Sequence, residues 1–228
     1  MPEATPIFSP EIFQFFRELG RHNKKTWMDA NRERYQQTVT KPFRRLLEEL
    51  SPKLLKLNAN FDVAARGGTN FSRINRDIRF AKDKTPYRTQ MYVKFSVPLP
   101  GEMEGGELYV GISAETVTAG FRIYAMPKRK QSPIALVAEP KLAAHPQLLS
   151  RQKSRLARRY ESYWYAMDKK EWTKHDGWPG VGDWSRLQGW IVRKKLAKSA
   201  ATATSFPADA GKIFRDLYPL LEFTSLAN

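Results

Sequence analysis

The side chains with the clearest capacity for chemistry lie between residues 70 and 89. Two carboxylates, Asp77 and Asp83, stand there among six cations, which are Arg73, Arg76, Arg79, Lys82, Lys84 and Arg88. Large apolar residues that we expect in the core are interleaved with these charges: Phe71, Ile74, Ile78, Phe80 and Tyr87. Unpaired burial of so many guanidinium groups would be costly. The mixture therefore predicts a hydrogen-bonded ionic cluster held on a sheet, facing an anion or a cleft.

An extended backbone would divide this stretch between two faces. With a period of two, Arg76 falls on the face of Ile74, Ile78 and Phe80, while the opposite face carries Arg73, Asn75, Asp77 and Arg79. An arginine among apolar neighbours needs a partner, and Asp77 or Asp83 across a turn is the natural candidate. The sequence from Asp83 to Pro86 has the composition of a turn.

Three interpretations of this cluster stay open from the sequence. The cations could clamp a phosphate or carboxylate, because guanidinium groups bind such anions bidentately and Lys82 or Lys84 would add a point charge. They could instead form a salt-bridge network that locks a strand–turn–strand unit. In the third interpretation Asp77 or Asp83 is a catalytic general base. Magnesium binding by these two carboxylates is disfavoured because six nearby cations oppose an ion, so no metal and no cofactor is expected.

A second basic region runs from Arg151 to Lys198. Thirteen lysines and arginines face five acids there, among many tyrosines and tryptophans. Cations and flat rings together are typical of surfaces that bind nucleic acid. The alternative is that most rings fill the core, because tryptophan buries a large area. The expected anion contacts of this secondary basic surface are Arg155, Arg158, Arg159, Arg193, Lys194 and Lys195.

Motifs for other chemistries are missing from the sequence. The three histidines, His22, His145 and His175, have no spacing typical of a zinc helix, and we expect each to be structural or on the surface. The G-x-S-x-G nucleophile elbow and the glycine-rich nucleotide-binding patterns do not occur. With no cysteine in the chain, disulfides, thiolate zinc sites and a cysteine nucleophile are excluded.

Composition favours a well-packed protein with a polyanionic partner. Apolar residues make up 41% of the 228 residues and aromatics 12%, which is ample for a core. The net charge is +16 and the isoelectric point is about 10.0, so nucleic acid, anionic lipid or phosphorylated ligands are the expected partners. We expect neither a membrane span nor a signal peptide, and a cytoplasmic location fits best. The sequence makes no prediction of oligomeric state.

Helices, then strands, then helices are the elements that must position these residues. The spacing of apolar residues predicts that most of 10–58 is helical, in pieces separated at Pro42 and Pro52. Residues 69–125 have the pattern of short strands, including 91–97 and a hairpin of 107–113 and 116–124 that turns at Ala114-Glu115. Helices are predicted again at about 133–139, 144–159 and 207–218, while 160–192 has little periodicity.

This order of elements predicts an α+β fold. N-terminal helices would pack on a mainly antiparallel sheet of about four strands, with further helices at the C-terminus. We expect a single domain over residues 1–228, with a helical layer at about 10–58, the sheet at about 69–125 and a C-terminal helical region at about 132–220.

From Arg73 to Arg88 the chain resembles a bacterial and fungal family classed as a domain of unknown function. The family hallmark is R-I-N-R-D-x-R-F-x-x-D-K-x-P-Y followed by K or R, and this stretch matches every fixed position. Asn23 and Trp27 are similar to the family's N-x-x-x-W, and residues 106–124 to its strand pair. The resemblance is strong to about residue 125 and loose after 160. It implies the fold but no agreed activity.

The leading hypothesis is therefore a binding protein for phosphate-bearing ligands, with nucleic acid favoured. Arg73, Arg76 and Arg79 would grip phosphate, and Asp77 and Asp83 would orient them. The first alternative is an enzyme that acts on a phosphorylated or acidic small molecule, with Asp77 or Asp83 as general base. The second is a structural or interaction module in which the hallmark only locks the fold.

Overall fold

The computed structural model describes residues 5–98, 105–124, 133–145, 147–168, 171–180 and 182–224. The N-terminal helices are α1 (Glu11–Arg21), α2 (Lys25–Ala30), α3 (Arg32–Tyr35), the π-helix η1 (Gln36–Thr40) and α4 (Lys41–Leu55). The strands are β1 (Gln90–Ser96), β2 (Glu107–Ser113), β3 (Val117–Tyr124), β4 (Glu161–Ala166), β5 (Trp172–His175) and β6 (Leu187–Leu196). The C-terminal helices are α5 (Pro133–Ala144), α6 (Gln147–Leu156), the short 3-10 helix η2 (Trp184–Arg186), α7 (Lys198–Ala201) and α8 (Phe206–Thr224).

The fold is α+β, built around one antiparallel sheet with the strand order β1-β2-β3-β6-β4-β5. The sheet has six strands, so the prediction of about four was wrong. The strand at 91–97 and the hairpin at 107–124 are confirmed with small shifts at their ends. The extra strands β4, β5 and β6 come from residues 161–196, which lie in the region predicted to be helical.

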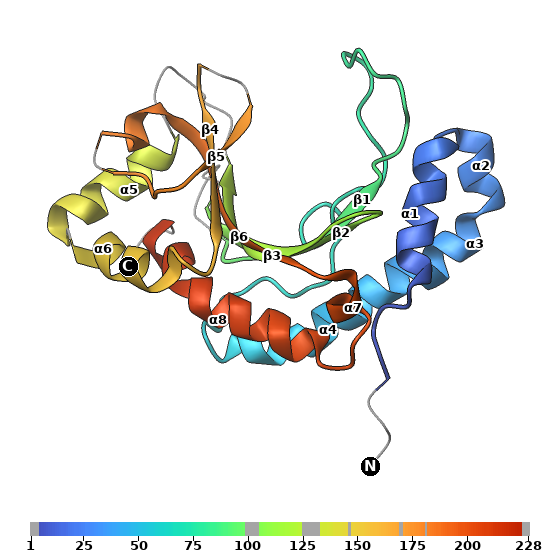
Figure 1. Ribbon diagram of the computed structural model, residues 1–228, viewed down its shortest axis with the longest axis horizontal. Helices are drawn as coiled ribbons and strands as arrows, with labels where there is room; N and C mark the ends of the chain where they lie inside the picture. The colour runs from blue at the N-terminus through green and yellow to red at the C-terminus, as the bar shows by residue number, and fades with distance from the viewer. Residues whose placement is uncertain are drawn as a thin grey trace.

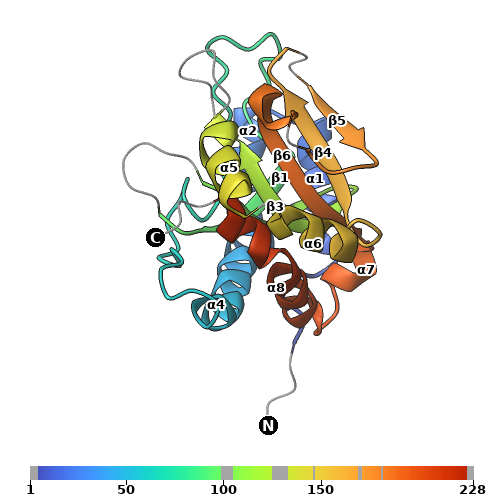
Figure 2. The ribbon, with the colours of Figure 1, turned by 90° about the vertical axis from the view of Figure 1, so that its left-hand side faces the viewer.

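Helices cover one face of this sheet. Figures 1 and 2 show α4 and α8 lying along the same side of the strands. Alternate residues of β1 are buried, and Phe95 packs edge-on against Phe214 of α8 with ring centroids 5.6 Å apart. Trp190 of β6 lies on the same face and contacts Phe121 and the buried Trp184. The prediction that the tryptophan rings mostly fill the core is thus confirmed for Trp178, Trp184 and Trp190.

Proline does not divide the N-terminal helices as the sequence predicted. Pro52 lies inside α4, which continues to Leu55. Pro42 is in the first turn of α4, directly after the π-helical turn η1. In a regular α-helix the ring of Pro42 would clash with the carbonyl of Thr38, and a widened π turn at this point relieves that clash. The helical run therefore continues through the proline.

The outer edge of β1 is covered by the chain's own residues 62–72. The Asp62 amide donates to the Ser96 carbonyl at 2.9 Å, and the Ser72 amide to the Tyr92 carbonyl at 3.0 Å. The Lys94 amide donates in turn to the Asn70 carbonyl at 2.7 Å. Asn70 is itself buried, and its side chain bonds backbone groups of Asp62, Arg66 and Lys94. Residues 62–72 thus fix the point from which the hallmark stretch departs.

Every helix in the described ranges is too short or too polar to span a lipid bilayer.

Candidate functional site

The hallmark stretch forms a two-stranded arm, residues 73–88, and not a strand of the sheet. The Arg76 amide donates to the Pro86 carbonyl at 2.8 Å, and the Arg88 amide donates to the Ile74 carbonyl at 2.7 Å. Asn75 and Tyr87 form an antiparallel bridge between the two legs. Figure 1 shows the arm rising beside β1, away from the side that α4 and α8 cover. The expectation that these charges are held on a sheet was therefore wrong.

The side chain of Asn23 holds the base of the arm. Because Tyr87 faces Asn75 as a non-hydrogen-bonded pair, its own N–H and C=O point away from the other leg of the arm. Asn23 lies between α1 and α2 and satisfies both groups. Its amide nitrogen donates to the Tyr87 carbonyl at 2.8 Å, and its amide oxygen accepts the Tyr87 N–H at 3.0 Å. This explains the Asn23 of the N-x-x-x-W motif as a structural residue.

Arg76 and Asp83 lock the two legs of the arm together. The Arg76 guanidinium donates to the Asp83 carboxylate at 2.5 Å and to the Thr85 carbonyl at 3.2 Å, and it also contacts the Thr85 hydroxyl. Asp83 further accepts the Thr85 amide at 2.9 Å. These bonds, the Thr85 amide first, lower the pKa of Asp83 to about 2. The partner expected for Arg76 is thus Asp83.

The tip of the arm is exposed. Phe80, expected in the core, is 95% exposed, and that prediction was wrong because the arm leaves the sheet before reaching it. Asp77 accepts hydrogen bonds from the Arg79 guanidinium at 2.8 and 3.0 Å, both groups being solvent-exposed. Lys84 donates to the Ile78 carbonyl at 3.0 Å, which closes the tip. An exposed ion pair of this kind contributes little to stability and leaves its cation available to a ligand.

Three cations of the arm have no hydrogen-bond or ion-pair partner among the described residues. Within the described residues, the exposed side chains of Arg73, Lys82 and Arg88 make no hydrogen bond or ion pair. The structure therefore divides the hallmark cations into two groups. Arg76 is committed to the lock, whereas Arg73, Lys82 and Arg88 face solvent.

The arm offers little to an acid–base mechanism. Asp77 and Asp83 are both exposed, and hydrogen bonds lower the pKa of each, from Arg79 for Asp77 and from Thr85 and Arg76 for Asp83. A carboxylate with a lowered pKa is a weak base at neutral pH. In the part of the chain that the structure describes, no group of three or more histidine, aspartate or glutamate side chains could hold a metal ion.

A second group of cations lies on the open face of the sheet, the face opposite α4 and α8. The register places there alternate residues of each strand, and apart from Ile191 they are mainly polar, aromatic or glycine. Chief among them are Tyr92, Lys94, Glu107, Tyr109, Arg122, Glu161, Tyr163, Arg193 and Lys195. The pattern is the reverse of the helix-covered face, where the same strands carry leucine, isoleucine, valine and phenylalanine.

Arg122 occupies the centre of the open face on β3. It lies opposite Glu107 across the β2–β3 pair and donates to that carboxylate from Nε at 2.7 Å. Its guanidinium also lies 5.5 Å from the ring centre of Tyr92 and 5.6 Å from that of Tyr109. Burial raises the pKa of Tyr109 to about 12, so this phenol stays neutral. The guanidinium of Arg122 and the rings of Tyr92 and Tyr109 thus pack together as one layer over strands β1 to β3.

Arg193 extends this layer onto β6. Its guanidinium lies 4.1 Å from the ring centre of Tyr163 on β4, and its Nε is 3.5 Å from the Glu161 carboxylate. The Nε is buried and has no hydrogen-bond partner among the described residues. Glu161 is shared with Lys174, which donates to it at 3.1 Å. Arg193 is therefore neutralised only in part by its neighbours.

The arm and the open face meet at Tyr92. Burial raises the pKa of this phenol, and the positive charges of Arg122, Arg193 and Arg88 oppose the shift, in that order. These three guanidinium groups come from β3, β6 and the end of the arm. From the sequence alone, Arg88 and Arg193 are predicted on separate surfaces, and Arg122 is not among the predicted anion contacts. Of the three, Arg122 is the one whose guanidinium lies over the Tyr92 ring, at 5.5 Å from its centre.

The secondary basic surface predicted for residues 151–198 is split by the fold. Arg155 and Arg159 bond Asp216 of α8, at 3.4 and 2.6 Å, on the side covered by helices. Arg158 is exposed near them, at the end of α6. Arg193 and Lys195 lie instead on the open face, while Lys194 alternates to the other side of β6. The six residues therefore do not form one surface.

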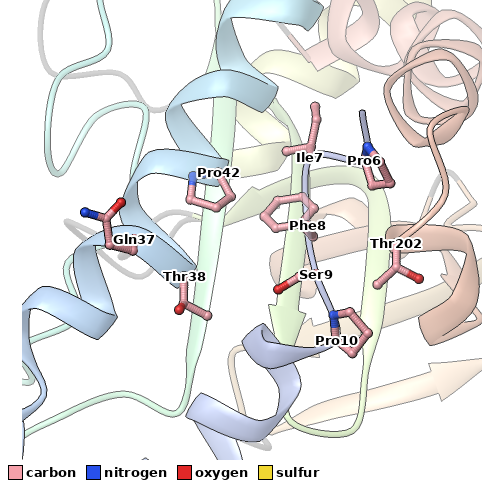
Figure 3. A pocket seen from close by; sticks show the side chains of 9 residues that line it. All are labelled: Pro6, Ile7, Phe8, Ser9, Pro10, Gln37, Thr38, Pro42 and Thr202. Carbon is pink, nitrogen blue, oxygen red and sulfur yellow. The ribbon is translucent and has the colours of Figure 1, made fainter. Parts of the chain in front are cut away.

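A depression of about 580 Å³ lies elsewhere, between the N-terminal segment, η1 and α7 (Figure 3). It is lined by Pro6, Ile7, Phe8, Ser9, Pro10, Gln37, Thr38, Pro42 and Thr202. None of these side chains is titratable. The depression has hydroxyl and amide groups but no cation, so it does not match the predicted anion site.

Residues of the open face could have been found from the sequence. The predicted hairpin turning at Ala114-Glu115 already sets Glu107 opposite Arg122. Period-two alternation then places Tyr109 and Arg122 on one face and the aliphatic residues of β2 on the other. The contribution of Arg193 could not be found in this way, because β6 was not predicted.

Comparison with known proteins gives a family without a described activity. No curated protein matches the sequence. The model of the conserved hypothetical protein family DUF2461 matches residues 11–223, which include the arm, the whole sheet and nearly all of the helices. The chain therefore belongs to the conserved hypothetical protein family DUF2461.

Proposed function

We propose that this protein binds phosphate-bearing ligands, above all nucleic acid, on the open face of the sheet together with the arm. The observation that carries the proposal is that the strand register sets Arg122 of β3 and Arg193 of β6 on the same open face, each guanidinium lying over a tyrosine ring. Guanidinium groups bind phosphate oxygens bidentately, and several of them at one place favour a ligand with more than one phosphate.

Charge on this side of the molecule supports the proposal. Glu107 and Glu161 are the carboxylates that neutralise the open face, and each is shared by two or more cations. Lys195 and the exposed arm residues Arg73 and Lys82 add charge without an ion-pair partner in the described ranges. A positive excess of this kind, in a chain of net charge +16, attracts a polyanion and steers its association.

The lock of Arg76 and Asp83 has a separate role in this proposal. It shapes the arm, and we do not place Arg76 among the contacts that bind phosphate. The enzyme alternative, with Asp77 or Asp83 as general base, gains no support from two exposed carboxylates of lowered pKa. Binding is the function that the geometry supports best.

The test is fluorescence anisotropy of labelled DNA and RNA oligonucleotides over a series of salt concentrations. Binding should weaken steeply with salt, with a log–log slope of about −0.9 per phosphate neutralised on duplex DNA and about −0.7 on single strands. The double variant Arg73→Ala/Arg88→Ala removes two exposed cations of the arm, so it should fold normally. We expect weaker binding and a slope reduced by the loss of about two phosphate contacts.

A matched control removes two exposed cations from the helix-covered side. In Lys56→Ala/Arg215→Ala the net charge changes by the same amount, but neither residue lies on the open face or the arm. This variant should keep the wild-type slope. Absence of binding at physiological salt would refute the proposal, and so would equal losses in the two double variants.

A further inference from the structure

Three aromatic side chains lie side by side at one end of the open face. The register sets Tyr124 of β3 opposite Gly189 of β6, Gly189 opposite Tyr165 of β4, and Tyr165 opposite Trp172 of β5. Tyr124, Tyr165 and Trp172 therefore cross four neighbouring strands at one level, and we call them the aromatic row. Every ring of the row contacts the other two, with centroids 5.3 to 5.9 Å apart.

The rings of the row lie over the backbone of Gly189. A β-carbon at this position would come within 2.6 Å of the Trp172 ring and 2.9 Å of the Tyr124 ring. Because Gly189 has no side chain, the rings of Trp172 and Tyr124 pack directly on the backbone of β6, and a larger residue at this position would displace them. Tyr124 and Trp172 nevertheless each remain 37% exposed, in contrast to the buried Trp178, Trp184 and Trp190. The row therefore presents aromatic surface to solvent.

The neighbouring level of the open face carries two cations, each of which is paired with a glutamate. Arg122 lies two residues before Tyr124 on β3, and Lys174 lies two residues after Trp172 on β5. Two residues of a strand span about 7 Å, close to the reach of one extended nucleotide. A ligand that covers both levels would meet flat rings first and cations next. Charge at this distance favours an anionic ligand over a neutral one such as an oligosaccharide.

We propose that the aromatic row stacks unpaired bases, so that the nucleic acid bound by this protein is single-stranded. The inference rests on the proposed function and narrows its substrate class. Bases of a duplex are stacked on one another and cannot offer their faces to a protein ring, whereas those of a single strand can. Sequence preference should be weak, because every base has a flat face to stack.

The experiment compares three labelled oligonucleotides of one length: a single strand, the same sequence in a duplex, and an abasic single strand that keeps the phosphates. Wild-type protein should bind the single strand more tightly than the other two at the same salt concentration. Trp172→Ala should weaken binding of the single strand about tenfold, as alanine substitution at stacking residues does. Its affinity for the abasic strand should equal that of the wild type.

The control variant is Leu55→Ala, which shortens an apolar side chain of similar exposure, 39%, on α4 and away from the open face. It should bind like the wild type. Circular dichroism checks that Trp172→Ala is folded; if it is not, the wild-type comparison of normal and abasic strands decides the matter alone.

Equal affinity of the wild type for normal and abasic strands, or tighter binding of the duplex, would overturn the aromatic row as a stacking site and leave the proposed function intact. Binding of a neutral glucose oligomer by the wild type, if it is lost in Trp172→Ala, would overturn the proposal too, because the aromatic row would then be a carbohydrate site. Failure of the wild type to bind any of the three oligonucleotides would refute the proposed function itself.

Discussion

Removing the Asn23 side chain should loosen the arm at its base. This amide makes two hydrogen bonds to the backbone of Tyr87, at 2.8 and 3.0 Å, joining residues far apart in the sequence. At a net contribution of about 1 kcal/mol for each bond, Asn23→Ala should lower the free energy of unfolding by about 2 kcal/mol. The two Tyr87 groups that lose their partner lie in a partly buried region, so water can replace the amide only in part.

Urea unfolding and hydrogen exchange would measure this effect. The urea midpoint should fall without a change in slope, and exchange of the Arg76 and Arg88 amides, which donate across the arm, should rise by roughly thirtyfold if the arm opens locally by the same free energy. Asn60→Ala is the matched control, because this exposed asparagine makes no side-chain hydrogen bond to the described residues. Equal stability of the two variants, with unchanged exchange at Arg76 and Arg88, would show that Asn23 does not hold the arm.

Three further predictions concern the arm and the sheet. Asp83→Asn should destabilise the protein above about pH 4, the ordinary pKa of aspartate, as measured by the urea midpoint. The difference from the wild type should vanish as the pH falls toward about 2, because the pKa of Asp83 in the folded state is lowered to about 2 and the carboxylate stops stabilising the fold once it is protonated. Phe80→Ala should leave the thermal midpoint unchanged because the ring is 95% exposed, whereas Phe95→Ala, in the core against α8, should cost about 3–5 kcal/mol in chemical denaturation. Gly120→Ala should cost about 1–3 kcal/mol, since its β-carbon would collide with the backbone of β6, while Gly177→Ala, with nothing near it, should unfold at the wild-type denaturant concentration.

The strands that the sequence revealed are those with one apolar and one polar face. In β2 and β3 the apolar residues point to α8 and the polar ones to the open face, so alternation is visible. β4 lacks this signal because Tyr163 and Tyr165 put aromatic residues on the open face, while Trp164 lies on the opposite face. A segment that is aromatic on both faces has no period of two, and residues 160–192 were therefore left without strands.

The position of the hallmark stretch was also predicted wrongly from the spacing of its apolar residues. Phe80 and Ile78 were placed in the core because large apolar residues at regular spacing usually are. In the structure the base of the arm is held by Asn23 and by Tyr87, which is buried in the core, and Arg76 with Asp83 joins the two legs further along, whereas the tip with Phe80 is exposed. A contact between residues 23 and 87 leaves no trace in local spacing. Asp83 was one of the two partners that the sequence predicted for Arg76, because the composition of residues 83–86 indicates a turn that would bring it back.

The covering of β1 by residues 62–72 determines how open the edges of the sheet are to the addition of another strand. An unpaired strand edge is a template on which another chain can add a strand, and long apolar edges are the most dangerous. β1 is such a strand, and backbone bonds from Asp62, Asn70 and Ser72 occupy its outer side. The other end of the sheet is β5, which spans only Trp172–His175 and carries Lys174. The backbone groups at the β1 edge are thus bonded within the chain, and the β5 edge is short and carries a charge, so neither edge favours the addition of another strand.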